Sequence, residues 1–261
     1  MTQKYMAQLF YLGTCYCGWQ AQKQIKGQKK SLQKVLEKTL KKITQEKIKV
    51  VASGRTDAGV HACGQVVHFE LEKNHYDINK LKHSLNALLP NDMKVLDLKK
   101  ISTNFHTQKD AIKKQYSYYI QQGPSPLPLL QPYTHYMWQK LNIKKMQTAM
   151  KYLIGKRDFK PFQASGAKQG STVREIIEAE VKISPVFFPN EISKDFFLIQ
   201  IRIVGSGFLK QMVRGIVGTL IQVGTEKRNP EVFQEILSTK KRALLGPTAL
   251  AKGLWLEKVW Y

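Results

Sequence analysis

The order of strand-like and helix-like apolar patterns is the feature that most constrains the fold of this 261-residue chain. Apolar residues that alternate or run together predict strands in the first half, at 5–12, 48–52, 65–71 and 95–101. Apolar residues spaced three or four apart predict helices at 31–43 and 78–89, with Ser31 as a cap and Pro90 as a stop. The first half is therefore predicted to run strand, helix, strand, strand, helix, strand.

The second half repeats this rhythm. Strands are predicted at 115–121, 173–183, 196–204 and 254–261, and helices at 143–154, 209–223 and 231–237. Gly155 is expected to cap the first of these helices. Two halves of similar order predict an α+β fold of two ferredoxin-like, RRM-like lobes with mostly antiparallel sheets and a central cleft. The lobes are expected to span residues 1–110 and 111–261.

The chain is strongly basic. Lys and Arg number 42 against 19 acidic residues, for a formal net charge of +23, and both halves share the excess. A polyanionic partner is the first expectation, and a solubility surface or a membrane-surface protein are the alternatives. The basic run of Lys23, Lys26, Lys29 and Lys30 fits either a solvated face or an RNA contact.

The sequence also argues against several classes of protein. No stretch of about 18 apolar residues predicts a membrane-spanning helix, and no signal peptide is expected. Three cysteines, Cys15, Cys17 and Cys63, form no paired framework, so a cytoplasmic protein is expected. A zinc site built from these thiols and His61 is disfavoured, because the spacings suit zinc poorly.

One loop between two predicted strands stands out for its chemistry. Residues 53–62 read Ser-Gly-Arg-Thr-Asp-Ala-Gly-Val-His-Ala. The glycines permit a tight backbone from which Asp57 can project as a carboxylate. A lone Asp in a loop is more often a turn former, so the residues by themselves leave both readings open.

This loop resembles the signature of the tRNA pseudouridine synthase A family. Further segments resemble other motifs of that family, at 11–14, 18–22, 105–118, 158–162, 207–218 and 253–261. The resemblance implies a homodimeric isomerase that turns uridine into pseudouridine in the anticodon stem-loop of tRNA, at tRNA positions 38–40. The reaction exchanges neither electrons nor groups, so no cofactor and no metal are expected.

The resemblance also assigns roles. It implies that Asp57 in the first lobe is the catalytic carboxylate and that Arg214 in the second lobe is its partner, completing the site and the RNA-binding cleft. Tyr116 would stack on the target base or assist proton transfer, and Arg55 and Lys109 would contact RNA. Whether Asp57 attacks the ribose, attacks the ring or drives elimination to a glycal stays open.

Two positions depart from the family pattern. Leu12 stands where the family usually has Asp, and Gln108 where it usually has Arg, with Lys109 beside it as a possible point charge. The structural alternatives are a surface helix cation for Arg214 and an ordinary strand aromatic for Tyr116. The functional alternatives are a catalytically silent RNA-binding protein of the same fold and a basic DNA-binding protein, although no helix-turn-helix or zinc finger is recognisable.

Overall fold

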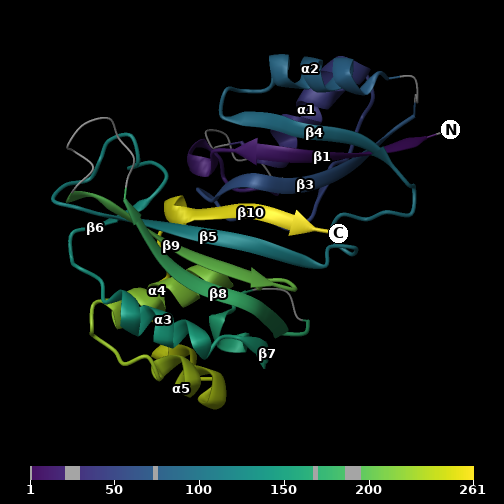
Figure 1. Ribbon diagram of the computed structural model, residues 1–261. Helices are drawn as coiled ribbons and strands as arrows, with labels where there is room; N and C mark the ends of the chain where they lie inside the picture. Colours follow the sequence, from purple (N-terminus) through teal and green to yellow (C-terminus); the bar gives the residue numbers. More distant parts are fainter. Residues whose placement is uncertain (1, 21–29, 73–75, 167–169, 186–194) are drawn as a thin grey trace. The chain divides into compact units, whose positions relative to one another are not determined.

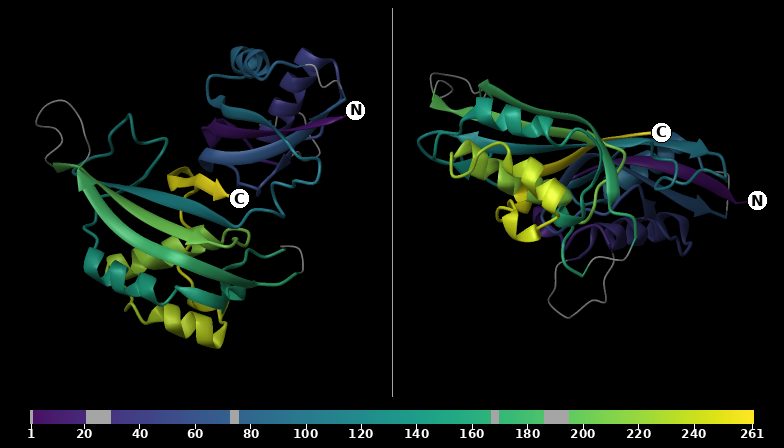
Figure 2. Two further views of the ribbon diagram at one scale, coloured as in Figure 1. Left: turned by 45° about the vertical axis from the view of Figure 1, so that its right-hand side comes forward. Right: turned by 90° about the horizontal axis from the view of Figure 1, so that it is seen from below.

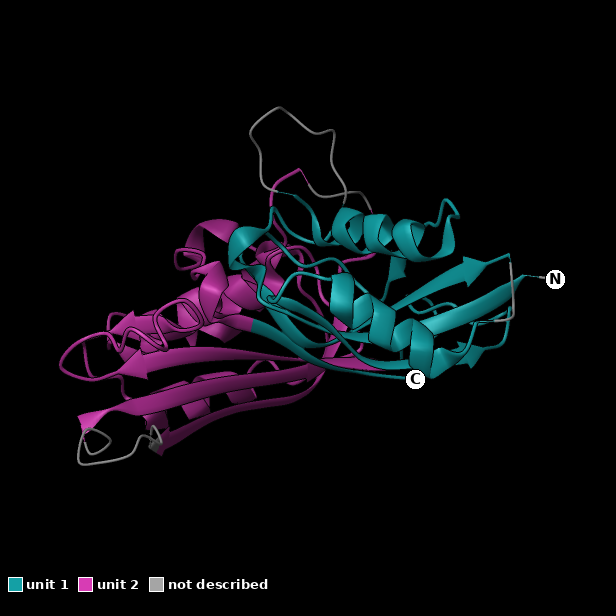
Figure 3. Cartoon of the chain, turned by 90° about the horizontal axis from the view of Figure 1, so that it is seen from above, with its two compact units in different colours: residues 1–112, 255–261 teal, residues 113–254 magenta. Residues whose placement is uncertain are grey.

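The computed structural model describes residues 2–20, 30–72, 76–166, 170–185 and 195–261, so Lys23, Lys26 and Lys29 lie outside the described residues. Two compact units make up the chain (Figure 3). Unit 1 comprises Met1–Ile112 and Trp255–Tyr261, and unit 2 comprises Lys113–Leu254. Strands that pair mostly antiparallel, together with helices, make both units α+β, as the sequence predicts.

Unit 1 has the predicted order of elements (Figure 1). They are β1 (Gln3–Tyr11), α1 (Leu32–Thr44), β2 (Val51–Ala52), β3 (His61–Leu71), α2 (Ile78–Leu88) and β4 (Met93–Ile101). Strand β1 pairs antiparallel with both β3 and β4, and β2 pairs antiparallel with β3. The spatial order β4-β1-β3-β2 is that of a ferredoxin-like lobe. Strand β10 (Leu254–Trp260) pairs parallel with β3 beyond the end of β2.

Capping and burial explain why these helices form where they do. The Ser31 hydroxyl accepts a hydrogen bond from the Lys34 amide at 3.3 Å and opens α1, as predicted. Asp77 opens α2 in the same way, accepting from the Lys80 amide at 2.8 Å. Leu32, Leu36 and Leu40 of α1 and Leu81 and Leu85 of α2 are buried, together with alternate residues of β1. Figure 2 shows the two helices on the same side of the sheet of unit 1.

Unit 2 repeats the strand, helix, strand, strand, helix order, with further elements added to it. Its elements are β5 (Lys113–Gln122), β6 (His135–Met137), α3 (Ile143–Lys151), β7 (Gly155–Asp158), β8 (Val173–Pro185), β9 (Phe197–Gly205), α4 (Met212–Gly224) and α5 (Val232–Thr239). The repeated order runs through β5, α3, β8, β9 and α4, and the short strands β6 and β7 and the helix α5 are the additions. The strands lie in the order β6-β5-β9-β8-β7, antiparallel except that β6 runs parallel to β5. Helices α3 and α4 cover one face (Figure 1), where Ile199, Ile201 and Ile203 of β9 are buried.

The structure corrects two details of the sequence prediction. Gly155 is not the C-cap of α3, because the helix ends at Lys151 with Tyr152 as its cap. Gly155 instead opens β7 with φ at +102°, a conformation that favours glycine. Helix α4 begins at Met212 rather than at Leu209, because Gln211 takes a left-handed backbone conformation with φ at 61°.

The C-terminal strand also groups differently from the expected lobe at 111–261. Residues 255–261 belong to unit 1, because Trp255 and Leu256 pair with His61 and Ala62 of β3. The Ile112 amide adds a hydrogen bond to the Trp260 carbonyl at 2.9 Å. Within the described residues, no helix combines the length and the apolar character needed to cross a bilayer.

Candidate active site

Asp57 lies in the loop that joins β2 to β3, and the backbone of this loop is held on both sides of it. The Val60 amide donates to the Asp57 carbonyl at 3.2 Å, closing a turn in which Gly59 has φ at +80°. The Trp19 amide donates to the Thr56 carbonyl at 3.0 Å. The Asp57 residue itself is partly exposed. A fixed backbone that carries a partly exposed carboxylate residue suits a nucleophile or a base.

Buried polar groups support the loop from below. The Tyr11 and Thr56 hydroxyl oxygens lie 2.8 Å apart, and burial raises the pKa of Tyr11 to about 12, so its hydroxyl stays protonated. Gln65 donates to the Gly54 carbonyl at 2.9 Å and accepts from the Ser53 hydroxyl at 2.8 Å. These pairings satisfy the polar groups of Ser53 and Thr56, which are both buried, and leave the loop rigid.

Glycines let the first motif of the sequence lie against the Asp57 loop. Gly18 has φ at +100°, and a Cβ there would stand 2.8 Å from the Thr56 carbonyl oxygen. A Cβ on Gly13 would stand 2.0 Å from the Val60 carbonyl oxygen, closer than real atoms approach. The segments at 11–14 and 18–20 therefore pack against the backbone of the loop. This contact is not apparent from the sequence, because the segments lie about 40 residues before the loop.

His61 has a structural position rather than one in a metal site. Its Nδ1 accepts from the Gly13 amide at 3.1 Å, and its ring stacks on Trp255 at 4.5 Å between centroids. Cys15, Cys17 and Cys63 are free thiols. Where the chain is described, no group of three or more His, Cys, Asp or Glu residues could hold a metal ion.

Arg214 lies in the first turn of α4 in unit 2 and is partly buried, which argues against an ordinary surface cation. Its Nε donates to the Ala249 carbonyl at 2.8 Å. Tyr118 of β5 is buried, and this burial raises its pKa, while the nearby charge of Arg214 acts in the opposite direction. Arg214 is therefore held against the neighbouring 249–250 segment and close to β5.

Tyr116 belongs to the same unit as Arg214. It lies two residues before Tyr118 on β5, and so on the same face of the strand. Its side chain is 8% exposed and meets Phe208 edge-on, at 5.1 Å between ring centroids. Phe208 belongs to the connection between β9 and α4, which also leads to Arg214. Unit 2 thus brings Tyr116 and Arg214 into one substructure, and Asp57 belongs to unit 1.

Arg55 and Lys109 are both exposed residues of unit 1. Lys109 follows a tight turn in which its amide donates to the His106 carbonyl at 3.1 Å. The turn is anchored by Thr107, which is fully buried and whose hydroxyl lies 2.8 Å from His68 Nδ1. The Tyr261 hydroxyl donates to the Thr107 carbonyl at 2.9 Å. Sequence reasoning missed this support, because the side chains come from three distant segments and no local pattern links them.

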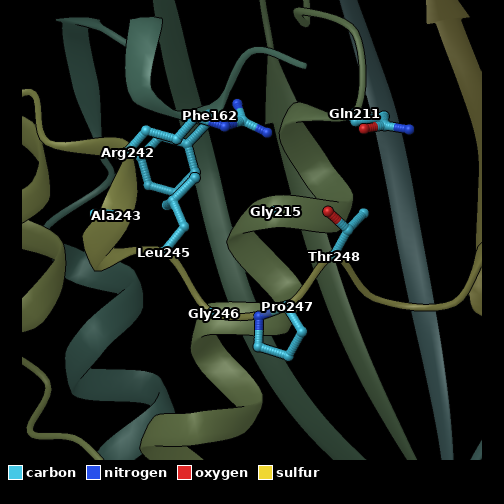
Figure 4. A pocket seen from close by; sticks show the side chains of 9 residues that line it. All are labelled: Phe162, Gln211, Gly215, Arg242, Ala243, Leu245, Gly246, Pro247 and Thr248. Carbon is cyan, nitrogen blue, oxygen red and sulfur yellow. The ribbon is translucent and has the colours of Figure 1, made fainter. Parts of the chain in front are cut away.

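A cavity of about 310 Å³ opens within unit 2 beside the start of α4 (Figure 4). Gly215 lines it from α4 and Gln211 from the position just before the helix. Phe162, Arg242 and residues 245–248 also line it. The Arg242 guanidinium donates to the Pro161 carbonyl at 3.2 Å. None of these cavity residues was predicted as a site residue, although Phe162 lies in the 158–162 motif, and Arg214 is not among the lining residues.

Comparisons of the chain with a family model and with individual proteins indicate the same family. A family model described as tRNA pseudouridine synthase matches residues 7–108 and 149–261. The tRNA pseudouridine synthase A of Chlamydia trachomatis serovar A is 39% identical over 263 residues, which covers 100% of this chain and 93% of that protein. The enzymes of the same name from Bdellovibrio bacteriovorus and a Thermoanaerobacter species are 40% and 38% identical, each over 96% of its own length.

Proposed function

Because this chain belongs to the tRNA pseudouridine synthase family and is an isomerase, we propose that it converts uridine to pseudouridine in the anticodon stem-loop of tRNA, at tRNA positions 38–40, with Asp57 as the catalytic carboxylate. The observation that carries the proposal is the Asp57 loop. Its backbone is fixed by Trp19 and Val60, and the Asp57 residue is partly exposed.

The isomerisation of uridine requires mainly a carboxylate in a fixed position and a pocket that holds the freed uracil. The C1′–N1 bond breaks, the freed uracil turns, and a C1′–C5 bond forms, while the hydrogen at C5 leaves as a proton and N1 gains one. The product is an isomer of the substrate, so no redox or group-donating cofactor enters the proposal. The target base must leave the stack before Asp57 can reach its sugar or ring.

The other candidate residues take roles that their surroundings allow. Arg214 would stabilise the ionised carboxylate, since its Nε is already committed to Ala249 and its remaining donors form the edge that suits a carboxylate. Tyr116 would stack on the uracil or pass a proton. Arg55 and Lys109, both exposed, would contact RNA, with Arg55 filling the space left by the flipped base.

The partner proposed for the chain is tRNA, bound by a homodimer in the cytoplasm, where the substrate is found. Support comes from the tRNA enzymes among its relatives and from the net charge of +23. The departures at Leu12 and Gln108 concern local RNA contacts. Gln108 is exposed next to Lys109, and the Leu12 amide is bonded to the Asp92 carbonyl at 2.9 Å.

Release of tritium from tRNA labelled at C5 of its uracils tests the proposal. Wild-type protein should release tritium, whereas Asp57→Asn should release none and still bind tRNA, because the shape is kept and the negative charge is lost. Asp57→Glu should fail as well, since the longer side chain displaces the carboxylate. Retention of more than about a tenth of the wild-type rate by Asp57→Asn would refute the assignment.

Asp77→Asn is the matched control for this experiment. Asp77 is an exposed N-cap of α2, and Asn caps helices about as well as Asp. This variant removes the same charge from the same unit and should keep full activity. The runner-up, a silent RNA-binding protein, predicts tRNA binding with no tritium release from the wild type either.

A further inference from the structure

Arg214 is tied to one short segment of unit 2 by two reciprocal hydrogen bonds, one from its side chain and one to its backbone carbonyl. Its Nε donates to the Ala249 carbonyl at 2.8 Å, and the Ala249 amide donates to the Arg214 carbonyl at 3.1 Å. A guanidinium has five N–H donors in one plane. Fixing the Nε edge therefore fixes the direction in which the four remaining donors point.

The segment at 246–250 is itself fastened to α4 upstream of Ala249. The Gly246 amide donates to the hydroxyl of Thr219 at 3.0 Å, and Thr219 is fully buried. At Gly218 the approach is so close that a Cβ would stand 1.7 Å from the Pro247 carbonyl oxygen. Figure 4 shows Gly246 and Pro247 running alongside the helix. Thr219 thus fixes the position of the segment along the axis of α4, about one and a half turns after Arg214.

A second fastening lies downstream of Ala249, on the sheet. The Tyr118 hydroxyl donates to the Leu250 carbonyl at 3.0 Å and lies 3.1 Å from His135 Nδ1. Burial raises the pKa of Tyr118, which keeps the hydroxyl protonated as a donor. Gly253 continues the contact, since a Cβ there would stand 2.6 Å from the Tyr118 ring. Ala249 is consequently bracketed by one anchor on the helix and one on β5.

We propose that the 246–250 segment is a clamp that aims the Arg214 guanidinium, and that Thr219 and Tyr118 are positioning residues for the isomerisation. This inference rests on the proposed function, because aiming matters only if Arg214 supports the catalytic carboxylate. Neither residue needs to touch the substrate. Each acts through a backbone group of the clamp, and a displacement of about 1 Å in a catalytic group is enough to cost roughly a hundredfold in rate.

The test compares three variants in tritium release under single-turnover conditions, with enzyme in excess. Thr219→Val keeps the side-chain shape and removes the hydroxyl, Tyr118→Phe does the same at the other anchor, and Thr219→Ser restores the hydroxyl. The first two should lower the rate per folded molecule by roughly 10–100-fold and leave the tRNA dissociation constant within about twofold of wild type. Thr219→Ser should keep at least about half of the wild-type rate.

A second readout separates positioning from a general loss of structure. If the clamp acts through Arg214, Thr219→Val and Tyr118→Phe should move the acid limb of the pH–rate profile in the same direction as Arg214→Met does. Loss of folded protein alone would lower the amplitude and leave the limb in place. Wild-type rates in both variants, or lowered rates with an unmoved limb, would overturn the clamp. Absence of tritium release from the wild type would instead overturn the proposed function.

Discussion

Neighbouring residues of the Asp57 loop differ in role: one is buried and holds the loop in place, and the residues beside it lie at the surface. Thr56 is 6% exposed and its hydroxyl pairs with Tyr11, so it builds the loop. Asp57 on one side of it is partly exposed and Arg55 on the other side is exposed, so both reach the surface of the loop. The distinction follows from the bonding of the backbone rather than from residue type. It means that Thr56 contributes to stability, while Asp57 and Arg55 are the residues of the loop that we propose act on the substrate.

Removal of Arg214 should leave the catalytic carboxylate poorly compensated. Arg214→Met keeps most of the side-chain bulk, so the fold should survive. We expect a strong loss of rate at neutral pH and a shift of the acid limb of the pH–rate profile to higher pH, because a carboxylate without a cationic partner binds its proton more readily. Single-turnover tritium release across pH measures both effects.

The control for Arg214→Met is Lys210→Met, an exposed residue four positions earlier, in the connection that precedes α4. It should change neither the rate nor the acid limb. An unchanged limb with full activity in Arg214→Met would show that Arg214 is not the partner of the carboxylate, and a loss in Lys210→Met would make that residue the next candidate.

His68 should make folding stability depend on pH. Burial, His106 and Lys4 lower its pKa to about 4, against the weaker opposing effect of Glu70 and Asp110. The folded protein therefore holds His68 neutral, and the unfolded chain binds a proton more readily below about pH 6.5. The stabilisation is complete above that pH and is lost as the pH falls toward 4, by about 1 kcal/mol at pH 5 after solvent screening.

Urea unfolding at pH 7 and pH 5 checks the prediction for His68. In His68→Gln the difference in unfolding free energy between the two pH values should shrink by about 1 kcal/mol. His83→Gln serves as the matched control, since His83 is exposed on α2. Equal pH dependence in wild type and His68→Gln would exclude His68 as the source.

At the scale of elements, we expect the connection between β1 and α1 to affect the rate of isomerisation, because its residue Gly18 packs against the loop that carries Asp57. Gly18→Ala would strain a backbone with φ at +100° and press on the Thr56 carbonyl at 2.8 Å. Gly155→Ala is the matched control, because Gly155 has φ at +102° and nothing lies within 4 Å of the added Cβ. Both should lose about 1–2 kcal/mol of stability from backbone strain.

Only Gly18→Ala should also lower the rate of tritium release per folded molecule, by roughly tenfold or more, because it displaces the loop that carries Asp57. Chemical denaturation measures the stability of the two variants, and the single-turnover assay measures their rates. Equal rates in both variants would mean that the loop adjusts without moving its carboxylate.

The elements that the sequence predicts well are those with local signals. Helix α1 has a capping Ser31 and a regular apolar stripe, and its predicted start agrees with the structure. Strands β6 and β7 were not predicted, because three and four residues are too few for an alternation to show. The start of α4 was placed too early, because the left-handed turn at Gln211 is imposed by surrounding structure that a local pattern does not contain.

Long-range pairing marks the limit of sequence reasoning for the whole molecule. The parallel pairing of β10 with β3 joins Trp255 to His61, nearly two hundred positions apart, and no local sequence pattern predicts this pairing. The same limit applies to the candidate site. Asp57 could be singled out from its loop, but the roles of Arg214 and Tyr116 came from family resemblance, because they belong to a different unit.

The net charge of the whole molecule should appear in the salt dependence of tRNA binding. A chain with a charge of +23 that contacts many phosphates releases many counterions on binding. The logarithm of the association constant should fall against the logarithm of salt concentration with a slope steeper than about −4, at roughly 0.7–0.9 per phosphate neutralised.

Single variants can separate the residues that contribute to the salt dependence of tRNA binding from those that contribute to the rate. Lys109→Gln removes an exposed cation from the 106–110 turn, so it should reduce the slope by about 0.7–0.9 while the rate at saturating tRNA stays near that of the wild type. Asp57→Asn should do the reverse, keeping the slope and losing the rate, because its carboxylate neutralises no phosphate. Fluorescence titration of tRNA from low to high salt measures both slopes. A wild-type slope near zero would mean that the basic surface does not meet the RNA backbone, and an unchanged slope in Lys109→Gln would remove that residue from the interface.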